Sequence, residues 1–101
     1  MNVFPFSLIT PEGKFFQGDV QSVTAPGQLG SFGVLAKHAP MINALRDGVL
    51  TVKTTDKESF FAINSGIFEI DRDGKAVALI DNAIPSQNVE EAKANLTQFK
   101  H

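Results

Sequence analysis

The stretch GIFEIDRDGKAVALID, residues 66–81, decides the fold. Its large apolar residues alternate with polar or small ones on either side of Asp73-Gly74, a pair that supplies both positive-φ positions of a two-residue hairpin turn. Such a turn fixes the register of the two strands and predicts facing apolar pairs on one side, Ile70 with Val77 and Phe68 with Leu79. The other side of the hairpin would then carry Glu69, Asp71, Ala76 and Ala78.

Two more hairpins show the same alternation. A turn around residues 55–58 predicts one apolar side made of the facing pairs Val52/Phe61 and Leu50/Ile63. Near the start of the chain, residues 10–13 (TPEG) predict a turn, and Gly18 predicts a bulge in the returning strand. The strand before that turn would point three apolar side chains one way, Phe4, Phe6 and Leu8. Together these short strands predict a mainly β fold, an antiparallel β-sandwich over residues 1–85.

The hydrophobic period changes after Pro85. Apolar residues recur at helical spacing as Val89, Ala92, Leu96 and Phe99, and Asn88 followed by Glu91 predicts a capping box. Residues 86–101 are therefore expected to hold one short amphipathic helix, over about residues 89–100. So short a helix is marginal in water, so its apolar stripe should dock on the sandwich or on a partner.

Composition excludes several classes of protein. The chain has 101 residues, 43% of them hydrophobic, a formal net charge of −2 and nine scattered Lys and Arg residues, which is typical of a single soluble domain and does not predict nucleic-acid binding. It has no cysteine, so disulfides and Cys-containing metal sites are excluded. The start MNVFPFSLIT has no Lys or Arg and contains Pro5, so neither a signal peptide nor membrane insertion is expected.

Candidate chemistry is sparse. His38 is the first candidate for acid–base chemistry, but the sequence offers no nucleophile elbow and no spacing of ligands that would make it part of a triad or a zinc site. Glu69, Asp71, Asp73 and Gly74 match the first positions of a calcium loop, but Ile80 stands where the bidentate Glu should be. The glycines of GQLGSFG, residues 27–33, lack the order of a phosphate loop. Neither an enzyme activity nor a cofactor or metal is expected.

Several separated motifs resemble one family. They are, in chain order, APG at residues 25–27, GSFGVLAKHAPM at 30–41, Asp47-Gly48, NSGIFEI at 64–70 and IDNAIP at 80–85. In this order and spacing they closely resemble the epsilon subunit of bacterial F-type ATP synthases, which is called delta in mitochondria. The resemblance covers nearly the whole chain, and several motifs in order are far more specific than any one of them.

The resemblance implies a β-sandwich of about ten strands on the rotating central stalk. The expected partners are the gamma subunit and the polar loops of the membrane c-ring, in a hetero-oligomer. The implied role is non-catalytic: the subunit clamps ring to shaft so that proton flow is coupled to ATP synthesis. The expected location is peripheral, on the cytoplasmic face of the bacterial inner membrane. An exposed, partly apolar patch on one sheet is also expected, because a subunit seen apart from its partner uncovers its interface.

Six residues are candidates for the interface with gamma and the c-ring: Thr10, Ser31, Phe32, Lys37, His38 and Asn43. Pro40 biases Ala39 toward extended backbone, so the loop can present His38 as a shaped contact. Ser31 and Phe32 stand where relatives commonly carry an acidic residue, and Lys37 stands where they usually carry Gly.

The C-terminal segment and the lack of Trp and Tyr lead to two further expectations. Many relatives end in a hairpin of two helices that inhibits ATP hydrolysis, and residues 86–101 have room for only one, so this inhibition is not expected here. The alternative to a stalk subunit is a stand-alone β-sandwich that binds peptide or carbohydrate, although the chain has no Trp or Tyr for stacking on sugars.

Overall fold

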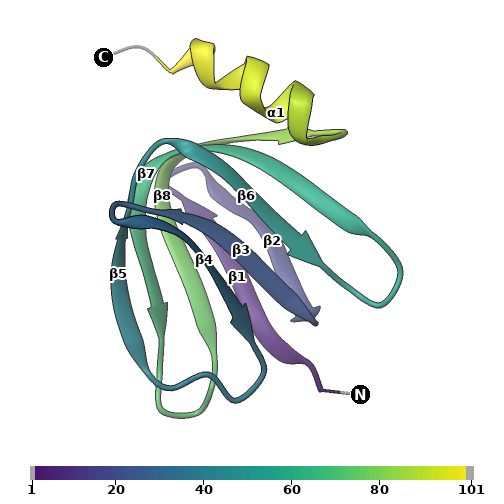
Figure 1. The fold of residues 1–101 in the computed structure, drawn as a ribbon, viewed down its shortest axis with the longest axis vertical. Helices are drawn as coiled ribbons and strands as arrows, with labels where there is room; N and C mark the ends of the chain where they lie inside the picture. Colours follow the sequence, from purple (N-terminus) through teal and green to yellow (C-terminus); the bar gives the residue numbers. More distant parts are fainter. Residues whose placement is uncertain (1, 100–101) are drawn as a thin grey trace.

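The computed structural model describes residues 2–99, and this part of the chain is mainly β, as the sequence predicts (Figure 1). Eight strands lie within it, followed by a short helix α1 (Val89–Asn95) and one turn of 3-10 helix (Leu96–Gln98). The strands are β1 (Phe4–Thr10), β2 (Gly13–Val20), β3 (Ser22–Gly27), β4 (Gly30–Leu35), β5 (Met41–Leu45), β6 (Gly48–Lys53), β7 (Glu58–Ile70) and β8 (Ala76–Ser86).

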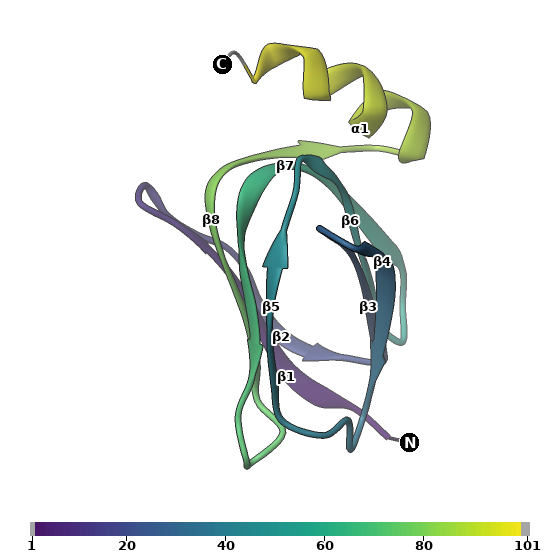
Figure 2. The ribbon, with the colours of Figure 1, turned by 60° about the vertical axis from the view of Figure 1, so that its left-hand side comes forward.

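The strands belong to one continuous hydrogen-bonded sheet that folds over into two facing layers (Figure 2). The order is β2-β1-β8-β7-β5-β3-β4, with β6 paired to both β3 and β7. Strand β1 runs parallel to β8, so the prediction of an antiparallel sandwich is wrong for this one pair, whereas the other described pairs are antiparallel. Strand β7 pairs with β6 through residues 58–63 and with β5 through residues 66–70, and β8 follows it along its length. The two long strands thus serve both layers, which explains why eight strands fill a sandwich expected to have about ten.

The register of β7 against β8 differs by one residue from the sequence-based prediction. Ile70 lies opposite Ala76, Phe68 opposite Ala78 and Ile67 opposite Leu79. Because side chains alternate between faces, this shift moves Val77 and Leu79 to the outer face and turns Ala76, Ala78 and Ile80 inward. The predicted facing pairs Ile70/Val77 and Phe68/Leu79 are therefore wrong.

The connection between β7 and β8 explains this register. It is a longer loop over residues 71–75 instead of a two-residue turn, and only Gly74 in it has a positive φ, of 83°. The Asp71 carboxylate oxygen Oδ1 accepts hydrogen bonds from the backbone N–H groups of Asp73 and Lys75, at 2.9 and 3.0 Å. Backbone bonds between Asp71 and Lys75 and from Gly74 to Asp71 close the loop.

The other two hairpins are closer to prediction. Between β6 and β7 the hydroxyl of Thr54 accepts the N–H groups of Asp56 and Lys57, so Leu50 faces Phe61. The predicted partner of Leu50 was Ile63, two residues away from Phe61. Because a shift of two residues leaves every side chain on the same face, the predicted side chains remain in the core. The turn at residues 10–13 is confirmed. The bulge falls at Phe15, however, while Gly18 pairs regularly with Phe6 and lies beside the ring of Phe16.

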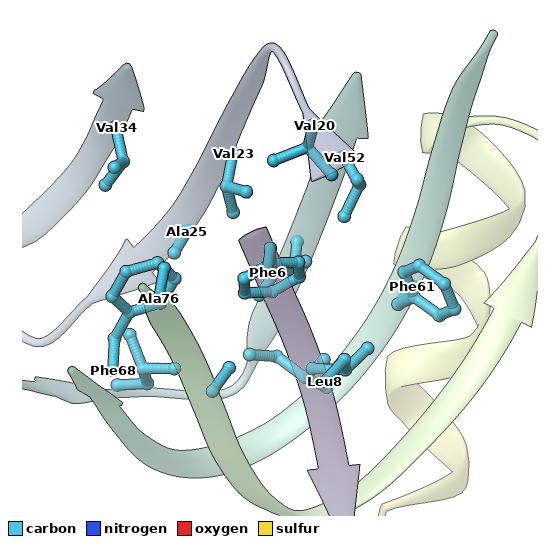
Figure 3. Packing of buried hydrophobic residues seen from close by; sticks show 14 of the residues in the cluster. Phe6, Leu8, Val20, Val23, Ala25, Val34, Val52, Phe61, Phe68 and Ala76 are labelled. Carbon is cyan, nitrogen blue, oxygen red and sulfur yellow. The ribbon is translucent and has the colours of Figure 1, made fainter. Parts of the chain in front are cut away.

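The core lies between the two layers and is built largely from aromatic and aliphatic side chains that several strands contribute (Figure 3). A row of four rings crosses it. Phe16 lies 6.0 Å from Phe6, Phe6 stacks on Phe68 at 5.8 Å, and Phe32 meets Phe68 edge-on at 5.5 Å, all measured between ring centroids. This row joins β2, β1, β7 and β4, and so connects the two layers.

Helix α1 lies across one end of the sandwich and contacts β6, β7 and β8 (Figures 1 and 2). The Asn88 side chain accepts the N–H of Glu91 at 2.8 Å, which confirms the predicted cap, and the Glu91 carboxylate accepts the N–H of Gln87. Ala92 is fully buried, Leu96 is half-buried and Val89 is exposed. The α-helix ends at Asn95, earlier than predicted. It is followed by the 3-10 turn and by the extended Phe99, whereas Lys100 and His101 lie outside the described residues.

Substitution of Gly66 should destabilise the fold. A Cβ at this position would lie 2.2 Å from the carbonyl oxygen of Leu79 and 2.6 Å from Cγ2 of Ile80, so β7 and β8 would have to separate. We expect Gly66→Ala to lower the free energy of unfolding by about 1–3 kcal/mol, as overpacked sites do. Gly33→Ala, where nothing lies within 4 Å, is the matched control in urea unfolding. Equal midpoints for the two variants would contradict the close approach of β7 and β8.

Removal of the Asp71 carboxylate should also destabilise the protein, because two backbone N–H groups would lose their acceptor. We expect Asp71→Ala to cost about 1–2 kcal/mol in thermal unfolding, within the range for hydrogen bonds to a charged group. Asp73→Ala removes a neighbouring carboxylate from the same loop and should change stability by no more than about 0.5 kcal/mol. If Asp73→Ala lowers the stability more than Asp71→Ala does, the two hydrogen bonds to the Asp71 carboxylate do not hold the loop.

Candidate functional site

The loop that contains His38 lies at the end of the sandwich opposite α1 (Figure 1). Lys37 adopts a left-handed backbone conformation with φ of 69°, which is uncommon for a residue other than glycine. The N–H of His38 bonds to the carbonyl of Leu35 at 3.3 Å, and its ring nitrogen Nδ1 lies 2.7 Å from the carbonyl oxygen of Ala39. Both Lys37 and His38 are exposed, so the tip of the loop is free to contact another molecule.

Charged groups from a second loop lie close to this one. Lys37 and His38 line a shallow hollow together with Arg72 and Asp73 of the β7–β8 loop and with residues 2–5 at the start of the chain. Two cations and one carboxylate therefore meet here, with His38 beside them. The predicted contact loop thus forms one side of a hollow lined by charged groups of both signs.

Two of the predicted interface residues have roles inside the fold. Thr10 is only 5% exposed, and its hydroxyl accepts the N–H of Glu12 at 3.1 Å and donates to the carbonyl of Gly13 at 3.4 Å. Phe32 is half-buried, with its ring edge-on to Phe68. Both residues stabilise the sandwich directly.

Ser31 and Asn43 lie apart from His38. Ser31 is exposed at the start of β4 and lines a hollow beside the helical segment with Arg46, Lys93 and Leu96. Asn43 is half-buried in the middle of β5, on the same side of that strand as the buried Leu45. The six predicted residues are therefore spread over both ends and the interior, and the structure does not bring them together into one site.

The described residues provide little for metal chemistry or for spanning a bilayer. Within residues 2–99, no group of three or more His, Asp or Glu side chains is arranged to hold a metal ion. No helix in the same part of the chain has the length and apolar character needed to cross a membrane.

The most prominent surface feature is an apolar outer face on the layer that contains β5, β7, β8 and β1. It consists of outward-pointing aliphatic side chains, Ile9, Ile42, Ala44, Ile67, Val77 and Leu79. Ile42 is 73% exposed, Ile67 49% and Leu79 48%. Large exposed aliphatics gathered in this way mark a protein-docking surface. The predicted exposed, partly apolar patch is thus confirmed.

Strand pairing aligns the members of the apolar outer face in a row. Ala44 on β5 lies opposite Ile67 on β7, Ile67 lies opposite Leu79 on β8, and Leu79 lies opposite Ile9 on β1. The strands are therefore held at sheet spacing beneath a continuous apolar strip. A continuous apolar strip of this kind suits a partner of complementary shape better than it suits a small ligand.

The identities of these residues were missed at the sequence level because a two-residue turn placed Val77 and Leu79 in the core. Two signals in the sequence could have corrected this. Ala76 and Ala78 are small, and small residues opposite Phe68 and Ile70 leave space for large side chains from the facing layer. An Asp directly after a strand is also a common side-chain acceptor for the backbone two residues later.

Comparison with known proteins agrees with this architecture. Residues 3–86 match the family model described as ATP synthase, Delta/Epsilon chain, beta-sandwich domain. The chain is 39% identical over 94 residues to the ATP synthase epsilon chain of a Nitratiruptor species, covering 92% of this chain and 72% of that protein. It is 41% identical over 90 residues to the ATP synthase epsilon chain of Rhodopseudomonas palustris, covering 89% of this chain and 66% of that protein.

Solved structures share the fold. A chain of the Euglena gracilis mitochondrial ATP synthase (OSCP/F1/c-ring) superimposes with a TM-score of 0.79 at 24% identity, covering 93% of this chain and 62% of that one. A chain of the Tetrahymena thermophila mitochondrial ATP synthase (central stalk/c-ring) gives 0.73 at 13% identity, covering 94% and 87%. At these identities the likeness concerns the fold alone. The family model and the two relatives carry the assignment: this chain belongs to the ATP synthase delta/epsilon family, and residues 3–86 are its β-sandwich domain.

Proposed function

We propose that this protein is a non-catalytic rotor subunit of an F-type ATP synthase, which holds the gamma subunit to the c-ring in the central stalk. Its relatives are ATP synthase epsilon chains, and its fold is that of a chain in a central stalk and c-ring assembly. In this role it forms and breaks no covalent bond. It transmits the torque that proton flow generates, as a peripheral component at the cytoplasmic face of the bacterial inner membrane.

The observation that carries the proposal is the apolar outer face. Ile42, Ile67 and Leu79 stay in water in the isolated chain, although burying such a side chain contributes about 1.5–3 kcal/mol. A permanent partner would recover that free energy, and the gamma subunit is the partner that this family implies. We therefore assign the apolar outer face to gamma.

The loop end of the sandwich has the complementary role. Lys37, His38 and Arg72 are polar and lie around a shallow hollow at the end away from α1. Polar and charged contacts suit the polar loops of a c-ring, which stay in water at the membrane surface. In the proposed arrangement, one flank of the sandwich holds the shaft and the end with His38 rests on the ring.

Disruption of the apolar outer face should weaken binding to gamma. We expect Ile67→Ser to raise the dissociation constant for purified gamma at least about tenfold, because the side chain lies at the centre of the apolar row and central residues dominate interface energies. Leu29→Ser is the matched control: Leu29 is fully exposed at the β3–β4 turn, outside the apolar outer face. Calorimetric titration measures both variants.

A second measurement links the same variants to coupling. In membranes that carry the assembled enzyme, loss of this subunit should let ATP hydrolysis proceed without proton pumping, and Ile67→Ser should reproduce part of that defect. Lack of binding between the wild-type chain and gamma at micromolar concentration would contradict the proposal.

Truncation of His38 should affect assembly but not folding. His38 is exposed, and among residues 2–99 its ring bonds only to the carbonyl of Ala39, so His38→Ala should leave the free energy of unfolding within about 0.5 kcal/mol of wild type. The variant should nevertheless be retained less well by complexes that contain the c-ring, in a pull-down assay at matched concentrations. A large loss of stability would instead give His38 a structural role.

A further inference from the structure

Glu69 places a carboxylate at the border of the apolar outer face, where this face meets the β7–β8 loop. It points outward from β7, with Ile42 opposite it on β5 and Val77 opposite it on β8. The residue is exposed, and within residues 2–99 no hydrogen bond or ion pair joins its carboxylate to another residue. The carboxylate therefore has no direct partner among the described residues.

The charges around Glu69 leave this face acidic. Asp71 and Lys75 line a hollow with Glu69 and Val77, and Asp81 lines a second hollow with Ile9 and Leu79. The two hollows thus hold three carboxylates and one ammonium group. The Asp71 carboxylate is further engaged by the backbone of its own loop.

Docking of an apolar partner surface would strip water from Glu69. An ionised carboxylate that loses its water without gaining a partner is strongly unfavourable, whereas a cation that arrives with the partner compensates for the lost water. Arginine fits this position well, because its guanidinium is weakly hydrated and can bond both carboxylate oxygens. The apolar residues on both sides would shield such a pair from solvent.

We infer that the occupant of the apolar outer face presents one Arg or Lys side chain that pairs with Glu69, between Ile42 and Val77. This inference rests on the proposed function, in which the occupant is the gamma subunit. The aliphatic row supplies the binding energy. The Glu69 pair fixes the register of the partner along the strip, because a partner displaced by one residue would leave a carboxylate and a cation unpaired.

The test is calorimetric titration of the full chain with purified gamma subunit. We expect Glu69→Gln, which keeps shape and hydrogen bonding but removes the charge, to weaken binding about 30-fold or more, as loss of one member of a buried charge pair does. Glu69→Lys should weaken it further. Glu58→Gln is the matched control, since Glu58 is an exposed residue at the other end of the same strand. Unchanged melting temperatures verify that all three variants fold.

Charge reversal on the partner provides a second readout. Exchange of one Arg or Lys on the bound surface of gamma for Glu should restore binding to Glu69→Lys and to no other variant. If Glu69→Gln binds like wild type while Ile67→Ser does not, the ion pair is wrong and the docking of gamma stands. If the wild-type chain fails to bind gamma, both fail together.

Discussion

Two backbone N–H groups bonded to one carboxylate, that of Asp71, hold β7 and β8 in a single register. That register assigns each side chain of the longest hairpin to the core or to the surface. Phe68 and Ile70 turn inward opposite Ala78 and Ala76, and the alanines leave room for the aromatic row that crosses the core. The rest of the sandwich assembles on this arrangement.

The same register creates the outer surface. Because Phe68 points inward, its neighbours Ile67 and Glu69 must point outward, where they meet Leu79 and Val77 of β8. The side chains that pack in the core and those that form the apolar outer face therefore lie on opposite sides of the same two strands, β7 and β8. A change in the loop at residues 71–75 that moved the register by one residue would exchange the core-facing and outward-facing side chains of β8. Such a change would damage folding and binding together.

Patterns of alternation sufficed to predict the strands and turns of three hairpins, those of β1/β2, β6/β7 and β7/β8, and the cap of α1 at Asn88. They did not predict β3, β4 or β5 as strands. The register of β7 and β8 escaped prediction because Asp73-Gly74 favours a two-residue turn, whereas the Asp71 side chain stabilises a longer loop. Only the structure reveals which of these competing local interactions wins. The spacing of motifs located the loop with Lys37 and His38, but it could not show that Thr10 is buried or that Phe32 packs on Phe68. Burial depends on long-range contacts that no short motif contains.

Strands β7 and β8 continue without interruption from one layer of the sandwich into the other. Sliding of one layer over the other would therefore have to bend a ribbon of two hydrogen-bonded strands, because no flexible connection is available there to absorb the movement. Gly66 adds to this resistance, because it lets the backbones of β7 and β8 approach closely where β7 stops pairing with β6 and begins to pair with β5. The sandwich is consequently expected to resist shear between its two layers, the mechanical property that a subunit under torque requires.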